Sequence, residues 1–217
     1  CSSDLINTHP KWRVIKGGSH SYLAPLTKPF ADRIRTGVEI QAIRRTSEGV
    51  SLDGEAFDQV VFACHGDQVL PMLADPTEAE RDVLRLFPFT RNDTTLHTDE
   101  ALLPRRSIAR ASWNYLLMGN RQVTMTYHMN RLQSLGVPEN YCVTLNADSI
   151  ISPTKVVKSM VYHHPRFDGQ AIAAQSRWSE ISGRNRTHYC GAYWFYGFHE
   201  DGVRSALRVA EALGVPA

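Results

Sequence analysis

The stretch that decides the fold is Thr187–Ala217, THYCGAYWFYGFHEDGVRSALRVAEALGVPA. Its pattern predicts a short strand over 187–190, an aromatic, glycine-bounded loop over 191–198, and an amphipathic helix capped near Asp201. The helix is expected to bury one apolar face: Val203, Ala206, Leu207, Ala210 and Leu213. A strand, a turn and a helix N-terminus in succession offer backbone N–H groups to an electron-rich ligand. The same pattern also fits a terminal helix that only packs on a sheet.

Composition narrows the class of protein. The chain has 217 residues, 42% of them hydrophobic, which is enough for a sizeable core in one large or two small domains. A net charge of +2 from 24 basic and 22 acidic residues argues against a nucleic-acid surface. The longest apolar run, Val60–Cys64, is far too short to span a membrane. We therefore expect a soluble protein.

The cysteines suggest the compartment. Cys64, Cys142 and Cys190 lie in apolar strand-like runs and no CxxC pair occurs, so free buried thiols in a reducing cytoplasm are expected. Cys1 at the start fits either an acylated lipoprotein or a fragment of a longer protein. We favour the fragment, because a patterned segment rather than a polar tether soon follows Cys1.

Periodicity predicts a mixed α+β or α/β fold. The segments outside the terminal stretch are an irregular helix capped by Ser19, a hairpin from Val38 to Leu52, a buried strand over 57–63, helices over 66–73 and 77–86, strands over 94–98, 112–117, 123–128, 141–145 and 156–162, a brief helix over 129–135, and a longer helix over 168–182. The five strands are expected to form an antiparallel sheet inserted between helical parts.

Several chemistries lack a motif. His163 and His164 are neighbours on a predicted strand, so their side chains leave opposite faces and no metal site is expected. Cys64 closes an apolar run, where a thiol is usually inert, although His65 follows it. No Walker loop and no GxGxxG occurs, but a nucleotide-binding segment can lie outside a fragment.

Aromatic residues are dense around the terminal loop, and they can line a planar ligand or build a core. The cluster consists of Tyr189, Tyr193, Trp194, Phe195, Tyr196 and Phe198. Its position directly before a helix N-terminus supports a binding site as much as it supports packing.

The chain resembles the C-terminal part of flavin-containing amine oxidases and phytoene desaturase-like oxidoreductases. Within them it is most similar to a bacterial group described as predicted NAD/FAD-binding proteins or dehydrogenases. Six segments carry the resemblance: WRVIKGGSHSYLAPL, FDQVVFACHGDQVLPML, NDTTLHTDEALLPRR, ASWNY, MNRLQSL and CGAYWFYGFHEDGVRSAL, of which GFHEDG is the most specific.

The resemblance implies FAD as cofactor and a divided domain plan. Residues 1–85 and 168–217 would form an incomplete FAD-binding domain, and 86–167 an antiparallel-sheet substrate domain, with an N-terminal Rossmann half outside this chain. The implied cofactor-binding residues are Ile40, Ala63, Gly191, Ala192, Phe198, Glu200, Asp201, Gly202 and Val203. Trp113 and Tyr115 would face the substrate, and His199 or Tyr196 would serve any acid–base step.

The expected function is an FAD-dependent dehydrogenase or desaturase that moves a hydride from a substrate carbon to flavin N5. The substrate would be a small molecule, with a lipid suggested by the desaturase relatives. A flavin amine oxidase is the alternative within this class. A non-catalytic ligand-binding module is the alternative of another class.

Overall fold

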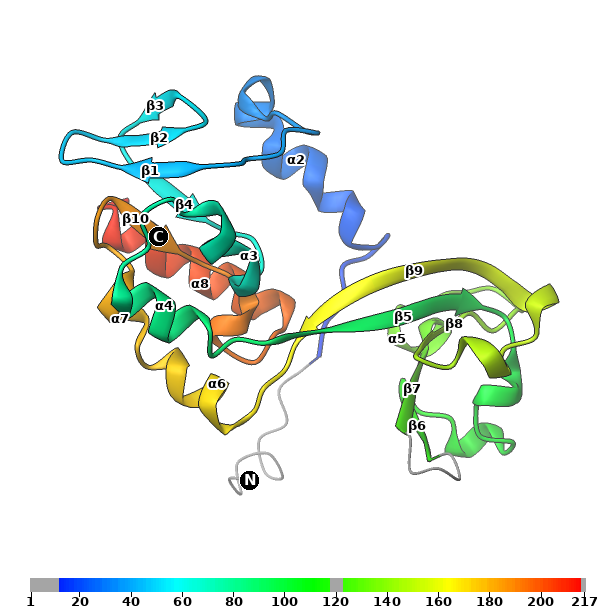
Figure 1. The fold of residues 1–217 in the computed structure, drawn as a ribbon. Coiled ribbons are helices and arrows are strands. Elements are labelled where there is room, and N and C mark those ends of the chain that lie inside the picture. The colour runs from blue at the N-terminus through cyan, green and yellow to red at the C-terminus, as the bar shows by residue number, and fades with distance from the viewer. Residues whose placement is uncertain (1–11, 118–122, 216–217) are drawn as a thin grey trace. The chain divides into compact units, whose positions relative to one another are not determined.

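A computed structural model describes residues 12–117 and 123–215 and confirms a mixed fold of helices and antiparallel sheets (Figure 1). Contacts divide the described residues into two compact units. Residues 37–91 and 163–215 form what we call the helical unit, and residues 12–36 and 92–162 form the sheet unit. The sheet unit combines 92–162 with the N-terminal segment 12–36, and the assignment of 86–167 as a substrate domain stays a prediction.

The helical unit begins with a small antiparallel meander. Strands β1 (Ile43–Arg45), β2 (Val50–Leu52) and β3 (Glu55–Phe57) pair in sequence order. The β2–β3 turn is Asp53-Gly54, where both residues have positive φ, as a tight hairpin requires. The predicted hairpin thus exists but starts later than expected, because Val38 and Ile40 precede β1.

A parallel strand pair lies at the centre of this unit. Strand β4 (Val60–Phe62) pairs in register with β10 (Thr187–Tyr189), although Val60 and Thr187 are 127 positions apart in the sequence. The helices that accompany the pair are α3 (Gly66–Met72), α4 (Glu78–Leu84), α6 (Gly169–Gln175), α7 (Trp178–Ile181) and α8 (His199–Ala212), with the 3-10 turn η7 (Ala192–Trp194). Thr77 and Glu80 form the predicted capping box at the start of α4.

The core of the helical unit is apolar and aromatic. Its fully buried side chains include Val69, Leu84, Ile181, Tyr189 and Trp194. Phe62 stacks on Tyr189 with ring centroids 5.6 Å apart and planes 7° from parallel, so the two parallel strands are joined by their side chains as well as their backbones.

Helix α8 differs from its prediction in two ways. It begins at His199 with Phe198 as N-cap, so Asp201 lies inside the first turn. The buried side of the helix carries Asp201, Ser205 and Val209, whereas the predicted apolar face is exposed, with Val203 49% and Leu207 46% accessible. The buried side combines the Ser205 hydroxyl, which bonds the preceding loop, with the core side chain of Val209.

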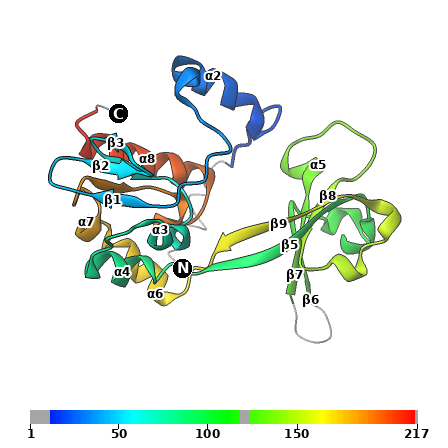
Figure 2. The same cartoon turned by 45° about the horizontal axis from the view of Figure 1, so that its top comes forward.

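The sheet unit contains a five-stranded sheet in the order β6-β7-β8-β5-β9 (Figure 2). The strands are β5 (Phe89–His97), β6 (Trp113–Leu117), β7 (Val123–His128), β8 (Cys142–Leu145) and β9 (Val156–Pro165). The β6–β7, β7–β8 and β5–β8 pairs are antiparallel, which confirms the predicted sheet. Short helical turns connect the strands: η3 (Glu100–Leu102), η4 (Ser107–Ala109), α5 (Met129–Leu132), η5 (Asp148–Ile150) and η6 (Pro153–Lys155).

The N-terminal segment is helical but broken. It consists of η1 (Ser19–Tyr22), α2 (Leu23–Thr27) and η2 (Lys28–Arg33), in which Phe30 departs from helical dihedrals. The predicted Ser19 cap is wrong, since Gly18 occupies the N-cap position. Among the described residues, no helix is both long and apolar enough to cross a membrane.

Candidate cofactor site

The predicted cofactor residues of the terminal stretch lie where the parallel strand pair ends. The Cys190 N–H donates to the Phe62 carbonyl over 2.9 Å, so Ala63 and Gly191 leave adjacent strands at the same edge. The carboxyl ends of parallel strands are the usual place for a ligand in an α/β sheet. Ile40 lies elsewhere, before β1, where it is partly buried against the core.

The loop between β10 and α8 is fixed by side chains of two helices. Ser205 Oγ of α8 accepts from the Gly191 N–H over 2.8 Å and donates to the Gly202 carbonyl over 2.7 Å. Gln175 Nε2 of α6 donates to the carbonyls of Tyr193 and Phe195, over 3.1 and 2.5 Å. These bonds hold the loop in one conformation, a property that a binding site needs.

Glycine is required at position 191 by the protein's own packing. A Cβ atom there would lie 2.5 Å from Cε1 of Tyr193, and Gly191 has φ of +151°. The same tyrosine ring would be 3.1 Å from a Cβ at Gly66, the first residue of α3. Tyr193 therefore packs between the two glycines, and Gly191 needs no ligand to explain it.

The N-terminus of α8 is organised differently. Asp201 turns back so that its Oδ2 accepts from the Phe198 N–H over 3.0 Å, which satisfies one donor that the helix leaves open. Its carboxylate is thus bound into the cap, while Glu200 is exposed. A Cβ at Gly202 would meet nothing within 4 Å, so packing among the described residues does not explain this glycine.

The predicted acid–base residues lie beside that helix end. Tyr196 is 77% exposed in the loop, and His199 is an exposed residue at the first position of α8. Val203 is half-exposed one turn further. Ala192 is partly buried at the start of η7. Exposed groups at a helix N-terminus are available to a ligand that docks there.

The terminal aromatic cluster separates into two sets. Tyr189, Tyr193 and Trp194 are buried and belong to the core, and burial raises the pKa of both tyrosine hydroxyls, so they stay protonated. Tyr196 and Phe198 are exposed, at 77% and 44%. The buried members of the cluster therefore build the core, and only the exposed members, Tyr196 and Phe198, are accessible to a ligand.

Sequence reasoning missed a histidine group near the same strand end. His65 follows β4, precedes α3 and stacks on Phe89 with ring centroids 4.4 Å apart. Burial lowers the pKa of His164, and the neighbouring His65 and His163 lower it further. The available signal was a histidine directly after a strand, which is weak without knowledge of the fold.

The predicted substrate residues lie on one face of the five-stranded sheet. Trp113 and Tyr115 project to the same side of β6, 39% and 66% exposed, while Asn114 is buried on the other side. Trp113 makes edge contacts with Trp12 and Tyr127. Register extends this face through the partly accessible apolar residues Leu117, Val123, Met125, Tyr127, Val143, Leu145 and Leu96. The buried Thr94, opposite Leu145, lies on the same face.

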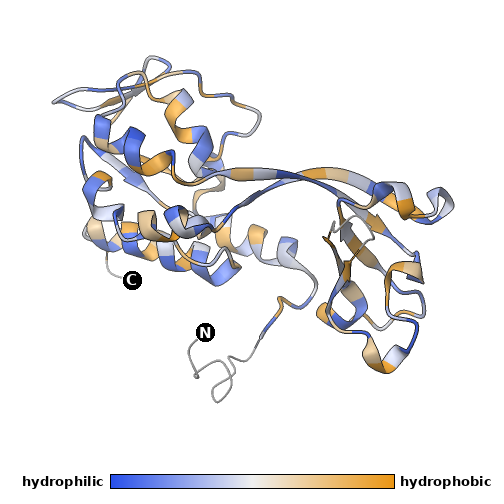
Figure 3. Cartoon of the chain, turned by 60° about the horizontal axis from the view of Figure 1, so that its bottom comes forward, coloured by the Kyte–Doolittle hydropathy of each residue, from blue (hydrophilic) through white to orange (hydrophobic). Residues whose placement is uncertain are grey.

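The opposite face of the sheet is mostly buried and polar, although Cys142 and the 37% exposed Leu116 also lie on it. It carries Thr95, His97, Thr124, Thr126, His128 and Thr144. Polar and apolar residues alternate along β7, and buried and accessible residues alternate along β8, as a two-residue repeat requires. Strand β5 is polar throughout from Thr90 to Thr95, and Figure 3 colours the ribbon by the hydropathy of each residue. The accessible face is thus the apolar one, which is unusual and marks a candidate surface for an apolar ligand.

The residues around the α8 N-terminus fit the flavin end of FAD. The carboxylate of Asp201 turns back into a cap, and the place at Gly202 is open. The exposed Glu200 carboxylate is not bound in that cap, so it has to turn away from an anionic ring edge. No glycine-rich pyrophosphate loop exists in the 217 residues, so the fit concerns the flavin end only.

Comparison with known proteins identifies the fold. No protein-family model matches the sequence, and no curated protein sequence is similar to it. Solved structures do match: a CLA-producing fatty acid isomerase from P. acnes, with TM-score 0.55, 15% identity and coverage of 82% of this chain and 48% of that protein. Putrescine oxidase bound to putrescine matches with TM-score 0.60, 11% identity and coverage of 91% and 53%.

A triple variant of putrescine oxidase, made in a redesign of its cofactor binding, gives TM-score 0.61 at 12% identity. The chain spans about half the length of these proteins. The likeness therefore assigns the fold of part of such an enzyme to this chain.

Proposed function

We propose that this chain forms the flavin-facing part of an FAD-dependent oxidoreductase, a dehydrogenase or desaturase. The observation that carries the proposal is the fixed turn from β10 into α8, with Asp201 bound in the cap and Gly202 open. The resemblance of the GFHEDG segment to flavoenzymes supports the same assignment. The pyrophosphate of FAD would be held by a Rossmann segment outside these 217 residues.

Each predicted residue then has a role. The N–H groups at the start of α8, around Glu200, would face the electron-rich edge of the ring, and the positive end of the helix would stabilise charge there. Phe198 and Val203 would supply apolar contact, Gly202 would allow close approach, and His199 or Tyr196 would orient the ring or exchange a proton. When bound, FAD supplies the acceptor for a hydride leaving a substrate C–H bond.

The substrate of this enzyme would be an apolar small molecule. The accessible face of the sheet, with Trp113 and Tyr115, offers aromatic and aliphatic side chains and few hydrogen-bonding groups. This surface suits a lipid or other hydrocarbon chain better than a charged metabolite. Free thiols at Cys64, Cys142 and Cys190 support a reducing compartment such as the cytoplasm.

A flavin amine oxidase is the second candidate, favoured by the likeness of fold to putrescine oxidase. The two candidates differ in substrate, so they are separated by whether an amine or an apolar compound reduces the bound flavin under anaerobic conditions.

The cofactor assignment is tested by substitution at the helix end. In a longer protein that also carries a Rossmann segment, Gly202→Asp would place a carboxylate against the anionic ring edge and crowd it. FAD affinity should fall and the flavin should become harder to reduce, because the new carboxylate opposes the helix dipole, whose own contribution is about 6 to 40 mV. Val203→Ala is the control, since it removes apolar contact without adding charge.

The measurements are FAD binding, by quenching of flavin fluorescence, and the midpoint potential. A folded Gly202→Asp variant with parental affinity and potential would show that α8 does not meet the flavin. A parent protein without any flavin absorbance or FAD binding would instead favour a non-catalytic binding module.

A further inference from the structure

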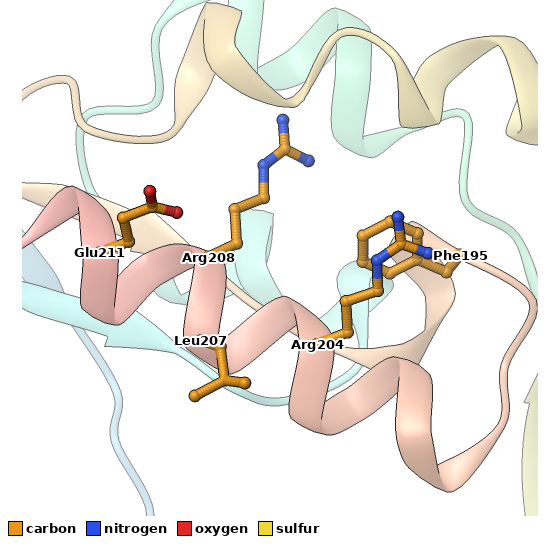
Figure 4. Close-up of a pocket in the computed structure, with 5 residues that line it drawn as sticks. All are labelled: Phe195, Arg204, Leu207, Arg208 and Glu211. Atoms are coloured by element: carbon orange, nitrogen blue, oxygen red, sulfur yellow. The ribbon is translucent and has the colours of Figure 1, made fainter. Parts of the chain in front are cut away.

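One pocket of the helical unit lies along α8, away from the cofactor residues at its first turn. It is an open depression of about 360 Å³ lined by Phe195, Arg204, Leu207, Arg208 and Glu211. Figure 4 shows both arginine side chains and Glu211 projecting from the same side of α8, whereas Leu207 points the other way. The pocket is thus a shallow site whose polar groups all come from one helix.

Aromatic rings hold both guanidinium groups. Arg204 Cζ lies 4.4 Å from the centroid of Phe195, and Arg208 Cζ lies 3.7 Å from the centroid of the Trp178 ring. A guanidinium stacked on a ring keeps its N–H groups in the plane, directed away from the ring. Each ring therefore holds one guanidinium in place, which reduces the conformational entropy that binding would cost.

The two arginines lack a counter-charge. Among the described residues, neither forms an ion pair with a carboxylate, and Glu211 lies in the pocket without reaching ion-pair distance. Residues four apart on a helix are neighbours, so two like charges stand side by side. Burial lowers the pKa of Arg208, and Arg204 lowers it further. An anion between the two groups would relieve this repulsion.

We propose that Arg204 and Arg208 bind a doubly charged oxyanion, of the class found in phosphate esters. Guanidinium forks match the oxygens of a phosphate group and make charge-assisted hydrogen bonds to it. The single carboxylate, Glu211, opposes such a ligand, so the site should be of modest affinity and sensitive to that residue. This site does not depend on the proposed cofactor, because it uses other residues.

The test is a calorimetric titration of the 217-residue chain with inorganic phosphate at constant ionic strength, with acetate as a singly charged comparison. Arg204→Gln and Arg208→Gln should each weaken phosphate binding by roughly 10- to 100-fold. Glu211→Gln should tighten it, a change that purely structural arginines would not produce. The matched control is Arg177→Gln, because Arg177 is already paired with Glu180 over 2.7 Å.

Arg208→Lys keeps the charge over Trp178 but loses the planar fork, so it should bind more weakly than the parent even if Arg208→Gln fails to fold. Glycerol 3-phosphate and vesicles of phosphatidylcholine with phosphatidic acid distinguish a soluble phosphate ester from a lipid headgroup. The proposal is overturned if the folded parent shows no saturable phosphate binding up to about 10 mM. It is also overturned if the Arg204, Arg208 and Glu211 variants bind like the parent, or if only an acidic peptide binds.

Discussion

A buried carboxylate joins three elements of the helical unit, and replacing it should destabilise that unit strongly. Glu80 of α4 is 1% exposed and accepts from Arg45 of β1, from the Tyr189 hydroxyl of β10 over 2.5 Å and from the Thr77 N–H over 2.8 Å. The Arg45 side chain is itself only 3% exposed. Glu80→Gln removes the charge and keeps the shape.

The structure sets the expected magnitude. Removing one partner of a buried ion pair costs about 3–5 kcal/mol, because the other charge stays buried. Asp75 still accepts from Arg45 Nε over 3.2 Å but is largely in water, so we expect about 3 kcal/mol for Glu80→Gln. Tyr189→Phe keeps the ring stacked on Phe62 and loses one bond to a charged acceptor, so it should cost about 1.5–3 kcal/mol.

Urea unfolding and native-state hydrogen exchange measure both changes. The Val60 and Cys190 amides, which bond across the β4–β10 junction, should lose protection in each variant. Glu78→Gln is the control in the same helix, where an exposed first-turn carboxylate contributes only about 0.3–1 kcal/mol. If Glu80→Gln costs no more than Glu78→Gln, the network does not hold the strands and the reasoning is refuted.

The ion pair of Glu80 with Arg45 also predicts that the fold loses stability in acid. Burial raises the pKa of Glu80, but the bonds from Arg45, Tyr189 and Thr77 outweigh it, and the net pKa lies below the ordinary 4.5. The stabilisation should be complete above pH 4.5 and be lost as pH falls through the folded-state value. A pH series of urea midpoints should show a steeper loss in the parent than in Glu80→Gln, which keeps the acid dependence of other carboxylates with a lowered pKa, such as Asp99.

Two further predictions concern substitutions at single positions, one at a buried histidine and one at two glycines. His97 is buried, accepts a backbone N–H at Nδ1 and bonds a threonine hydroxyl at Nε2. Burial lowers the pKa of His97, so the unfolded state binds a proton more readily than the folded state. The sheet unit should therefore lose stability as pH falls below 6.5, by up to about 1.4 kcal/mol per pH unit. His97→Gln should flatten that dependence, and the same substitution at the exposed His20 should leave it unchanged. Gly191→Ala should lower the free energy of unfolding by about 2 kcal/mol or more, because Tyr193 occupies the space that a Cβ needs. Gly202→Ala should instead stabilise α8 by about 0.5–1 kcal/mol, because nothing lies within 4 Å of the new Cβ. Equal effects of the two variants in thermal unfolding would contradict the packing described.

The sequence by itself determined the local elements of this protein. The two-residue alternation of β7 and the capping box of Thr77 and Glu80 are properties of short segments, and the structure reproduces both. The parallel pair β4–β10 was not predictable in this way, since nothing local indicates which distant strand will be the partner of Val60–Phe62. For the candidate site, the sequence predicted a strand, a turn and a helix in succession, but not the partner strand β4 beside which they lie.

Tertiary structure decided which side of each element is buried. Periodicity marked Val203 and Leu207 as the inward face of α8, yet Ser205 faces inward because its hydroxyl is bound to Gly191. The five-stranded sheet likewise buries a polar face and leaves the face of Trp113 accessible. The pattern of a short segment identifies the two sides of an element, but contacts with residues distant in sequence decide which side the fold encloses.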